Sequence, residues 1–194
     1  MRIALIGGEG VGKSTLAYSL SNYLSKHAAT ATVNLDPKCR HIKFKPVFDV
    51  RKLGKLDKTL PENKALSKIY SEAAPKLKRE QRGFDFVVMD VYGGLDFFLL
   101  DEGGDLLRKN ADLVLLLAEN NPDALDAVSG VAESAIEIPV LPVINKSDLI
   151  EKTKKQRKLT SARSHKTTGK RVLFVSAWER EGLRDLFNAI IGYR

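Results

Sequence analysis

The sequence predicts an α/β fold with three layers, in which a mostly parallel sheet is flanked by helices on both faces. Apolar runs typical of strands alternate along the chain with amphipathic segments typical of helices. Acidic or amide side chains follow several of these runs, and parallel sheets bind ligands at that edge. The chain has 194 residues, of which 43% are hydrophobic, so it can bury the core of one domain. We expect that domain to span residues 1–194.

The most specific motif is GGEGVGKST, from Gly7 to Thr15, between an apolar run at 2–6 and a helical pattern at 16–24. It fits G-x-x-x-x-G-K-[ST] in the strand–loop–helix setting that a phosphate-binding P-loop requires. Glycines let successive backbone N–H groups surround phosphate oxygens, and the helix N-terminus adds positive charge. We expect Lys13 to reach the β- and γ-phosphates and Ser14 to bind Mg²⁺. The expected phosphate-binding residues are Gly8, Glu9, Gly10, Val11, Gly12, Lys13, Ser14 and Thr15.

The next strand is predicted at 30–35, and Asp36-Pro37 ends it. Asp36 is placed to approach Mg²⁺ or to orient an attacking water, although Asp-Pro also simply begins turns. Residues 38–82 read as an insertion-like region. Its first half has weak periodicity, and its second half is a helix opened by Pro61 that Pro75 should end or kink.

A buried strand at 84–90 ends in Asp90, and Gly93 follows three residues later. This D-x-x-G pattern suits the second phosphate-side motif of P-loop proteins, with Asp90 holding Mg²⁺ and the Gly93 N–H facing the γ-phosphate. The predicted catalytic residues are therefore Lys13, Asp36, Asp90 and Gly93, and the predicted Mg²⁺ ligands are Ser14, Asp36 and Asp90.

The second half of the chain continues the alternation of strands and helices. A helix at 95–110 should be interrupted at Gly103-Gly104. Strands are expected at 112–118, 139–144 and 172–175, with a helix from 121 to about 134. A closing helix spans 182–191 and should turn inward Leu183, Leu186, Phe187, Ile190 and Ile191.

Asn145-Lys146-Ser147-Asp148 directly follows the predicted strand at 139–144. In this N-K-x-D arrangement a carboxylate accepts from the N1–H and 2-amino groups of guanine, whereas adenine would leave it unpaired. Asp148 as a helix N-cap is the alternative. The Ser176-Ala177 pair can offer a backbone N–H to guanine O6. The expected guanine-binding residues are Asn145, Lys146, Asp148, Ser176 and Ala177.

The charge and the cysteine content limit the classes of partner and the cellular compartment that we expect. The net charge is +8, and cations without acids fill the segment from Lys152 to Arg171. This basic segment could bind RNA or an acidic protein, or it could be a solvated helix and loop. Cys39 is the only cysteine, which excludes an internal disulfide, and no apolar run approaches the roughly 20 residues that span a bilayer. We expect a cytoplasmic protein without a membrane partner.

The order of these motifs resembles that of P-loop GTPases over nearly the whole chain, and the finer match is to the GPN-loop GTPases of the dimerising branch. GGEGVGKST is similar to that family's phosphate loop, VNLDP ending at Pro37 is similar to its V-N-L-D-P segment, and Asp49-Val50-Arg51 resembles its D-I-R segment. The family's Gly-Pro-Asn is imperfect here, with Pro61 and Asn63 near the expected place. Gly8 replaces a proline, and Gly94 replaces a glutamine.

The resemblance implies a Mg²⁺-dependent GTPase that hydrolyses GTP to GDP and phosphate and acts as a homodimeric switch or assembly factor. Two alternatives remain open. One is a nucleotide-binding module with negligible hydrolysis, acting on a protein or RNA through the segment from Lys152 to Arg171. The other is a metallochaperone-type GTPase that would use Cys39 and His41. Arg40 and Arg51 are the candidates for a cation that assists hydrolysis.

Overall fold

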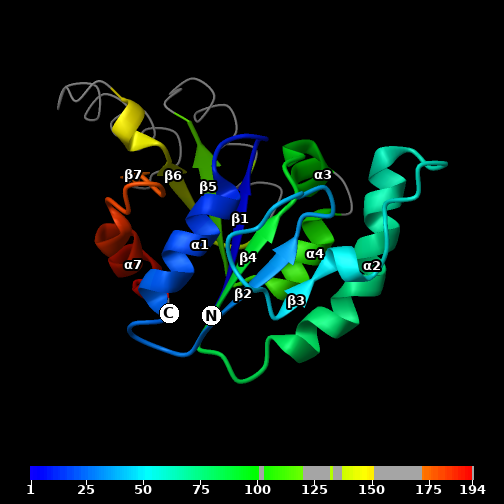
Figure 1. Cartoon of the computed structure of the whole chain (residues 1–194), viewed down its shortest axis with the longest axis horizontal. Coiled ribbons are helices and arrows are strands. Elements are labelled where there is room, and N and C mark those ends of the chain that lie inside the picture. The colour runs from blue at the N-terminus through cyan, green and yellow to red at the C-terminus, as the bar shows by residue number, and fades with distance from the viewer. Residues whose placement is uncertain (101–102, 120–131, 133–136, 151–171, 194) are drawn as a thin grey trace.

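Seven strands form one sheet in the computed structural model, which describes residues 1–100, 103–119, 132, 137–150 and 172–193. Figure 1 shows the sheet with helices on either side. The order of strands is β3-β2-β4-β1-β5-β6-β7, and each neighbouring pair is parallel. The strands are β1 (Arg2–Gly7), β2 (Thr30–Leu35), β3 (Phe48–Asp49), β4 (Phe86–Val91), β5 (Leu113–Ala118), β6 (Val140–Ile144) and β7 (Leu173–Phe174). The predicted α/β fold is confirmed, and the described sheet is entirely parallel.

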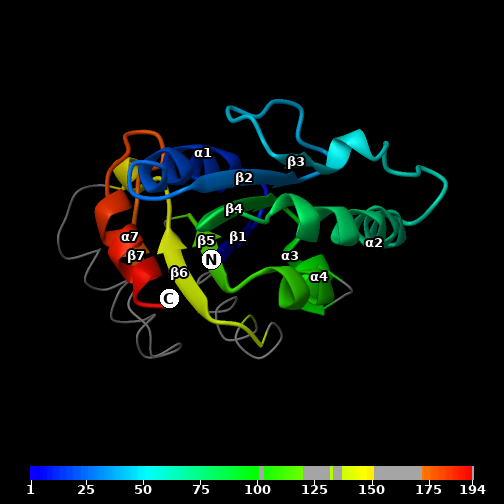
Figure 2. The same cartoon turned by 90° about the horizontal axis from the view of Figure 1, so that it is seen from below.

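The three layers follow from strands that are apolar on both sides. The central strands are buried almost throughout, as parallel strands covered by helices must be. Helices α1 (Lys13–Leu24) and α7 (Leu183–Ile191) pack on one face. Helices α2 (Glu62–Glu80), α3 (Leu95–Leu100) and α4 (Gly103–Asn110) pack on the other, and Figure 2 shows the two groups separated by the sheet.

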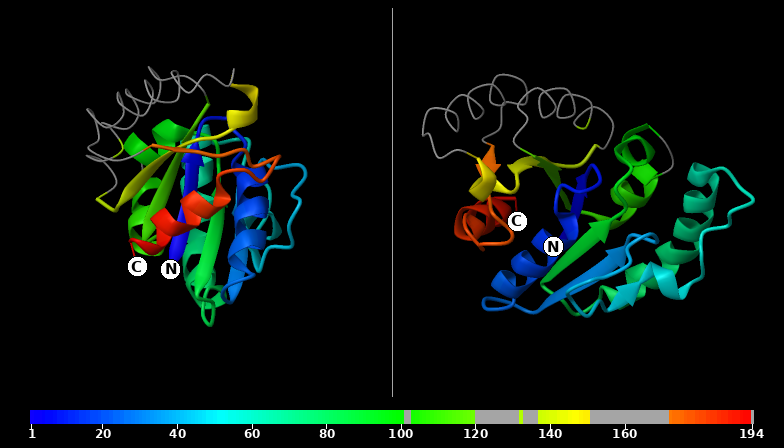
Figure 3. Two further views of the ribbon diagram at one scale, coloured as in Figure 1. Left: turned by 90° about the vertical axis from the view of Figure 1, so that its left-hand side faces the viewer. Right: turned by 45° about the horizontal axis from the view of Figure 1, so that its top comes forward.

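The parallel register gathers the strand ends that carry the predicted motifs. Asp90 in β4 is level with Leu5 of β1 on one side and with Asn34 of β2 on the other. Gly7, at the end of β1, is level with Leu117 of β5. The loops after β1, β2 and β4 therefore leave the sheet at the same edge (Figure 3).

Residues 38–82 contain little regular structure before α2, as expected. The first half contributes the two-residue strand β3 and a 3₁₀ helix at Val50–Lys52. Of the two outcomes expected for Pro75, an end of the helix is ruled out, because α2 continues through Pro75 to Glu80, and a kink stays a prediction. Tyr70 explains part of this persistence: its buried hydroxyl donates to the Leu35 carbonyl at 2.6 Å and ties the helix to the end of β2. Packing in the core thus outweighs the hydrogen bond that proline lacks.

Two other details of the helices differ from expectation. Gly103 and Gly104 do not interrupt a helix but begin α4, and α3 ends its described part at Leu100, with residues 101–102 outside the described residues. Ile191 is 39% exposed at the end of α7 and does not point inward, whereas Leu183, Leu186 and Ile190 are buried. The predicted helix from 121 to 134 lies, apart from residue 132, outside the described residues. No helix within the described part of the chain is long and apolar enough to cross a membrane.

Candidate nucleotide-binding site

The loop between β1 and α1 forms one wall of a cavity of about 300 Å³. The other walls come from the segments that follow β2 and β4. The lining residues are Glu9, Gly10, Gly12, Lys13, Ser14, Thr15, Asp36, Lys38, Tyr92 and Gly93. The structure therefore brings three predicted motifs together around one cavity, which we call the phosphate pocket. Among the predicted phosphate-binding residues, Gly8 and Val11 do not line it, and Val11 packs into the core.

Lys13 begins α1 and is buried to 7% exposure. Its ammonium donates to the carbonyls of Gly7 at 3.0 Å and Gly8 at 2.8 Å, which curls the loop around the side chain. Burial lowers the pKa of Lys13, and the charges of Asp90, Asp36 and Glu9 oppose that shift. No side chain caps the helix at Gly12, so the first N–H groups of α1 are open to an anionic ligand.

Asp90 is the most unusual group near this pocket. It is 1% exposed, and no described residue makes a hydrogen bond of good geometry to either carboxylate oxygen, although the Ser14 hydroxyl lies close enough to oppose protonation. Burial raises the pKa of Asp90 to about 6, a shift that Asp36 reinforces and that Ser14 and Lys13 oppose. Burial of a carboxylate without partners costs free energy, unless a cation, or a water molecule bound to a cation, pairs with the carboxylate. Its surroundings therefore fit a Mg²⁺ ion held beside Ser14.

Asp36 is held in a local turn that orients its carboxylate. Its Oδ1 accepts from the Lys38 N–H at 2.8 Å, and its own N–H donates to Asn34 Oδ1 at 3.1 Å. Burial raises the pKa of Asp36, while the Lys38 N–H and the charge of Lys13 oppose the shift. The Asp-Pro turn considered from the sequence exists, and the same turn presents Asp36 to the phosphate pocket.

Gly93 closes the pocket opposite the phosphate loop. A Cβ atom at this position would lie 2.8 Å from Glu9 Cγ and 3.3 Å from the Glu9 backbone nitrogen. Only glycine allows the segment after β4 to approach the loop this closely. The structure thus explains the glycine of the D-x-x-G pattern by the close approach of two backbones.

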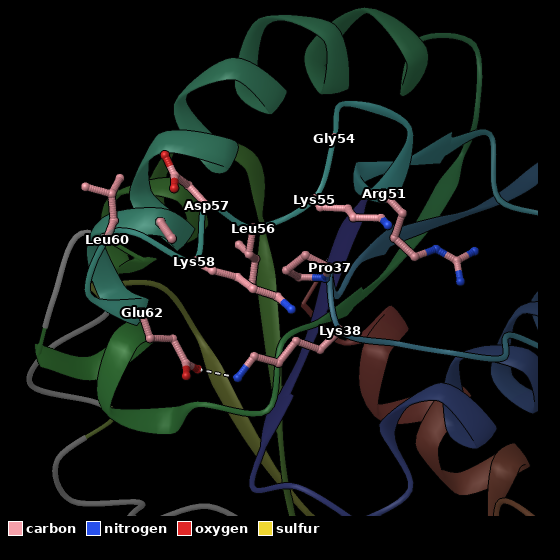
Figure 4. A pocket seen from close by; sticks show the side chains of 11 residues that line it. Pro37, Lys38, Arg51, Gly54, Lys55, Leu56, Asp57, Lys58, Leu60 and Glu62 are labelled. Carbon is pink, nitrogen blue, oxygen red and sulfur yellow. Dashed lines mark hydrogen bonds and ion pairs between the residues drawn. The ribbon is translucent and has the colours of Figure 1, made fainter.

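Two lining side chains were not predicted from the sequence, namely Lys38 and Tyr92. The Lys38 ammonium donates to Glu62 Oε1 at 2.7 Å and to the Tyr92 hydroxyl at 3.2 Å, and the Tyr92 hydroxyl also donates to Glu62. Lys38 lines a second, larger cavity of about 630 Å³ between the 51–60 loop and the start of α2. In Figure 4, the side chains of Lys38 and Glu62, which both line this cavity, point toward each other.

Arg51 does not line the phosphate pocket. Its guanidinium pairs with Asp49, with Nη2 at 2.6 Å from Oδ2, and its Nη1 donates to the Cys39 carbonyl at 2.9 Å. Asp49 also accepts from Asn34 Nδ2 at 2.8 Å. Figure 4 shows the guanidinium directed away from Lys38. The D-x-R segment is therefore a structural ion pair in this arrangement, and Arg40 is exposed.

Asn145 joins the phosphate loop to the segment that follows β7. Its Nδ2 donates to the Val11 carbonyl at 2.9 Å, and its Oδ1 accepts from the Ala177 N–H at 3.1 Å. The side chain is 2% exposed. A Cβ at Gly12 would lie 2.4 Å from Asn145 Nδ2, so glycine at that position is a condition for this bridge. Asn145 therefore ties the phosphate loop to the segment after β7, and its predicted role at guanine stays a prediction.

The remaining residues of the predicted guanine site lie around Asn145. Lys146 pairs with Glu119 at 2.5 Å, and Asp148 is partly exposed inside the 3₁₀ helix Ser147–Leu149, so it does not occupy an N-cap position. The N–H groups of Ser176 and Ala177 already donate to Glu181 and Asn145. Contact of either N–H with guanine O6 stays a prediction, and it would require an exchange of partner.

Trp178 follows these residues and is 71% exposed. The Lys43 ammonium lies 4.3 Å from its ring centroid, which is the geometry of a cation–π contact. Lys43 belongs to the segment after Asp36, so this contact joins that segment to the Ser176–Ala177 side of the site. The sequence offered only one signal for Trp178, its position directly after that pair.

Cys39 and His41 do not form a metal centre in the described part of the chain. The Cys39 thiol contacts the His41 carbonyl at 3.3 Å, and no group of three or more His, Cys, Asp or Glu side chains able to hold a metal occurs among the described residues. This arrangement gives the metallochaperone alternative no support.

A family profile described as "conserved hypothetical ATP binding protein" matches residues 5–190, which is most of the chain. The chain belongs to this family. It is also similar to a GPN-loop GTPase, PAB0955 of Pyrococcus abyssi, with 24% identity over 233 residues that cover 96% of this chain and 94% of the relative. The predicted resemblance to GPN-loop GTPases is therefore confirmed.

Several solved structures have a fold similar to that of this chain. The apo crystal structure of the Pyrococcus abyssi GTPase aligns with a TM-score of 0.83 at 23% identity, covering 100% of this chain and 97% of that one. HypB from Helicobacter pylori, in complex with nickel, aligns with a TM-score of 0.61 at 14% identity, covering 98% and 85%. The cell division protein MinD of Aquifex aeolicus gives 0.60 at 13% identity, covering 98% and 97%. These likenesses confirm the three-layer P-loop fold.

Proposed function

We propose that this family member is a Mg²⁺-dependent GTPase that hydrolyses GTP to GDP and phosphate, with the whole chain acting as one domain. The observation that carries the proposal is the unpartnered, buried carboxylate of Asp90 beside Lys13 and Ser14 at the phosphate pocket. Lone helix N-termini bind anions of many kinds, whereas this combination of a cation, a hydroxyl and an orphan carboxylate suits a phosphate chain with its metal.

Each group at the pocket then has a distinct task. Lys13 and the N–H groups that begin α1 stabilise charge on the leaving phosphates. Ser14 and Asp90, with Asp36 nearby, would hold Mg²⁺, which supplies further neutralisation of phosphate charge. Asp36 positions the attacking water, because Gly94 has no side chain that could do so. The Gly93 N–H faces the terminal phosphate.

The choice of base depends on Asp148. The description of the family profile names ATP, whereas the name of the Pyrococcus abyssi relative names GTP. A partly exposed carboxylate beside the Asn145 bridge suits the two donors of guanine, and adenine offers neither of them. We therefore propose GTP as the substrate.

Substitution of Asp148 with asparagine is expected to lower GTP affinity by about tenfold to a hundredfold and to leave ATP affinity unchanged, because one charge-assisted pair of hydrogen bonds to guanine is lost. Competition binding of GTP and ATP in Mg²⁺ measures this. Asp185→Asn, at an exposed position in α7, is the matched control. Equal loss for both nucleotides would contradict the guanine role, and ATP preference in the wild-type protein would overturn the proposed substrate.

Substitution of Asp36 with asparagine is expected to slow single-turnover GTP hydrolysis by about a hundredfold, because the group that positions the water loses its charge. GDP affinity in the absence of Mg²⁺ should be unchanged. Rapid-quench measurement with enzyme in excess separates this step from product release. Full activity in the Asp36→Asn variant would show that Asp36 does not position the water.

We also propose that the chain works as a cytoplasmic homodimer that switches with its nucleotide. Leu60, Pro61 and Asn63 form an exposed turn at the start of α2, where the resembling family carries its Gly-Pro-Asn loop. Leu60 is 37% exposed there and lines the larger cavity. Sedimentation with GDP and with a non-hydrolysable GTP analogue tests this, since a switch should dimerise more tightly with the analogue.

One observation favours the alternative of a binding module with negligible intrinsic hydrolysis. No arginine lines the phosphate pocket in the described structure, and Gly94 supplies no side chain. Tight GTP binding without turnover in the single-turnover experiment would support this alternative. The basic segment from Lys152 to Arg171, through which such a module would bind RNA or an acidic protein, lies outside the described residues.

A further inference from the structure

Among the described residues that line the phosphate pocket, Lys38 is the one cation other than Lys13. It lies two residues after Asp36, and its N–H donates to the Asp36 carboxylate at 2.8 Å. The turn that presents Asp36 therefore also fixes the position of Lys38. Tyr92, which precedes Gly93, contacts the same ammonium through its hydroxyl and its ring, whose centroid lies 5.0 Å away.

The partner of Lys38 in this structure is weakly held. The side chains of Lys38 and Glu62 are 43% and 48% exposed, and ion pairs at that exposure contribute little to stability. A terminal phosphate carries more charge than a carboxylate and offers three oxygens, which makes exchange of Glu62 for phosphate favourable.

We propose that Lys38 exchanges Glu62 for the γ-phosphate of bound GTP and stabilises that phosphate during hydrolysis. This inference rests on the proposed GTPase function and extends it to a residue that the sequence patterns do not single out. GDP lacks the γ-phosphate, so Lys38 returns to Glu62 after release of the product. Glu62 begins α2 directly after Pro61, so its contact with Lys38 ties the exposed 60–63 turn to the nucleotide site. The exchange releases this turn in the GTP state and restores the tie in the GDP state.

The alternative is a structural tie in which Lys38 and Glu62 merely hold the segment after β2 against α2. The two explanations predict opposite signs for two substitutions. If the contact is only a tie, Lys38→Met and Glu62→Gln break the same bond and have the same effect. If Glu62 competes with phosphate for Lys38, removal of the competitor strengthens GTP binding, whereas removal of the lysine weakens it.

The decisive quantity is the ratio of affinities for a β,γ-imido analogue of GTP and for GDP, measured by calorimetry in Mg²⁺. Lys38→Met is expected to lower this ratio by at least about tenfold, and Lys38→Arg should restore most of it. Glu62→Gln is expected to raise the ratio by up to about fivefold. Lys55→Met is the matched control, because Lys55 lines only the larger cavity, and it should leave the ratio unchanged.

Single-turnover hydrolysis completes the test. Lys38→Met should be slower than the wild-type protein even when every enzyme molecule carries GTP, while GDP affinity and the preference for GTP over ATP stay intact. Equal shifts in the same direction for Lys38→Met and Glu62→Gln, or no shift for Lys38→Met, would overturn the role of Lys38 and leave the GTPase proposal standing. Failure of the wild-type protein to bind either guanine nucleotide would overturn both.

Discussion

Replacement of Asp90 with asparagine is expected to stabilise the nucleotide-free protein at neutral pH and to abolish its Mg²⁺-dependent hydrolysis. Burial raises the pKa of Asp90 from 3.8 to about 6. An acidic group whose pKa is higher in the folded protein than in the unfolded chain stabilises the fold fully below its unfolded-state pKa. That stabilisation is lost as the pH rises through the folded-state pKa. Above about pH 6 the wild-type protein therefore carries a buried, ionised carboxylate that Ser14 and Lys13 compensate only in part, and asparagine removes that charge.

Urea unfolding measures the pH-dependent part of this effect. From about pH 4.5 to about pH 8, the stability of the wild-type protein relative to Asp90→Asn should fall by about 2 kcal/mol, which follows from a shift of about two units. Asp112→Asn is the control, because the stability of the wild-type protein relative to this variant should change with pH in the opposite direction. Burial alone would raise the pKa of Asp112, but hydrogen bonds from Arg2 outweigh burial and keep that pKa below its ordinary value.

The catalytic half of the prediction uses the same variant. Loss of the charge that faces Mg²⁺ should slow single-turnover hydrolysis by about a thousandfold and remove the dependence of nucleotide affinity on Mg²⁺. A variant that is stabilised at high pH and still binds nucleotide as tightly with Mg²⁺ as the wild-type protein does would show that Asp90 is buried for some other reason.

The Gly12→Ala variant is expected to lose nucleotide affinity by about a thousandfold and to be less stable even without nucleotide. The added Cβ would lie 2.4 Å from Asn145 Nδ2, and the backbone at Gly12 has φ +89, which disfavours any other residue. The strain costs about 1–3 kcal/mol. Displacement of Asn145 costs a similar amount again, because it leaves buried polar groups near Val11 and Ala177 unpaired.

Gly10→Ala separates the two contributions. Gly10 has φ +78, but no atom lies within 4 Å of the position of its Cβ, so this variant carries the backbone strain without the clash. The free energy of unfolding in urea should therefore fall by about 2 kcal/mol more for Gly12→Ala than for Gly10→Ala. Equal losses would show that Asn145 moves away at no cost and that the bridge is not rigid.

The sequence was sufficient to predict the fold and most of the phosphate pocket, because these depend on local patterns. An apolar strand followed by a glycine-rich loop and a helix allows few arrangements, and parallel strands bring their carboxyl ends to one edge. Asp36 and Gly93 therefore line the same pocket although they are far apart in the chain, and Asp90 lies near Asp36 and Lys13 without lining it.

The rest depends on contacts between segments that have no common pattern. Lys38 becomes notable only because α2 brings Glu62 to it, and the length of the 39–61 excursion is not encoded as a motif. Pro75 shows the same limit, since the local rule leaves both an end and a kink open, and burial of Tyr70 and Leu77 on either side of it favours a helix that continues. The N–H groups of Ser176 and Ala177 can be assigned acceptors only in three dimensions.

The contact between Lys43 and Trp178 gives this protein an optical property. The chain contains a single tryptophan, and its indole is largely in water with a cation over the ring. A nearby ammonium and the polarity of the solvent both change the emission of an indole, so the wavelength and intensity report how far the segment after Asp36 is from the base-side loop. The chain thus contains its single tryptophan at the contact between these two segments, and their separation can be followed in real time without a label.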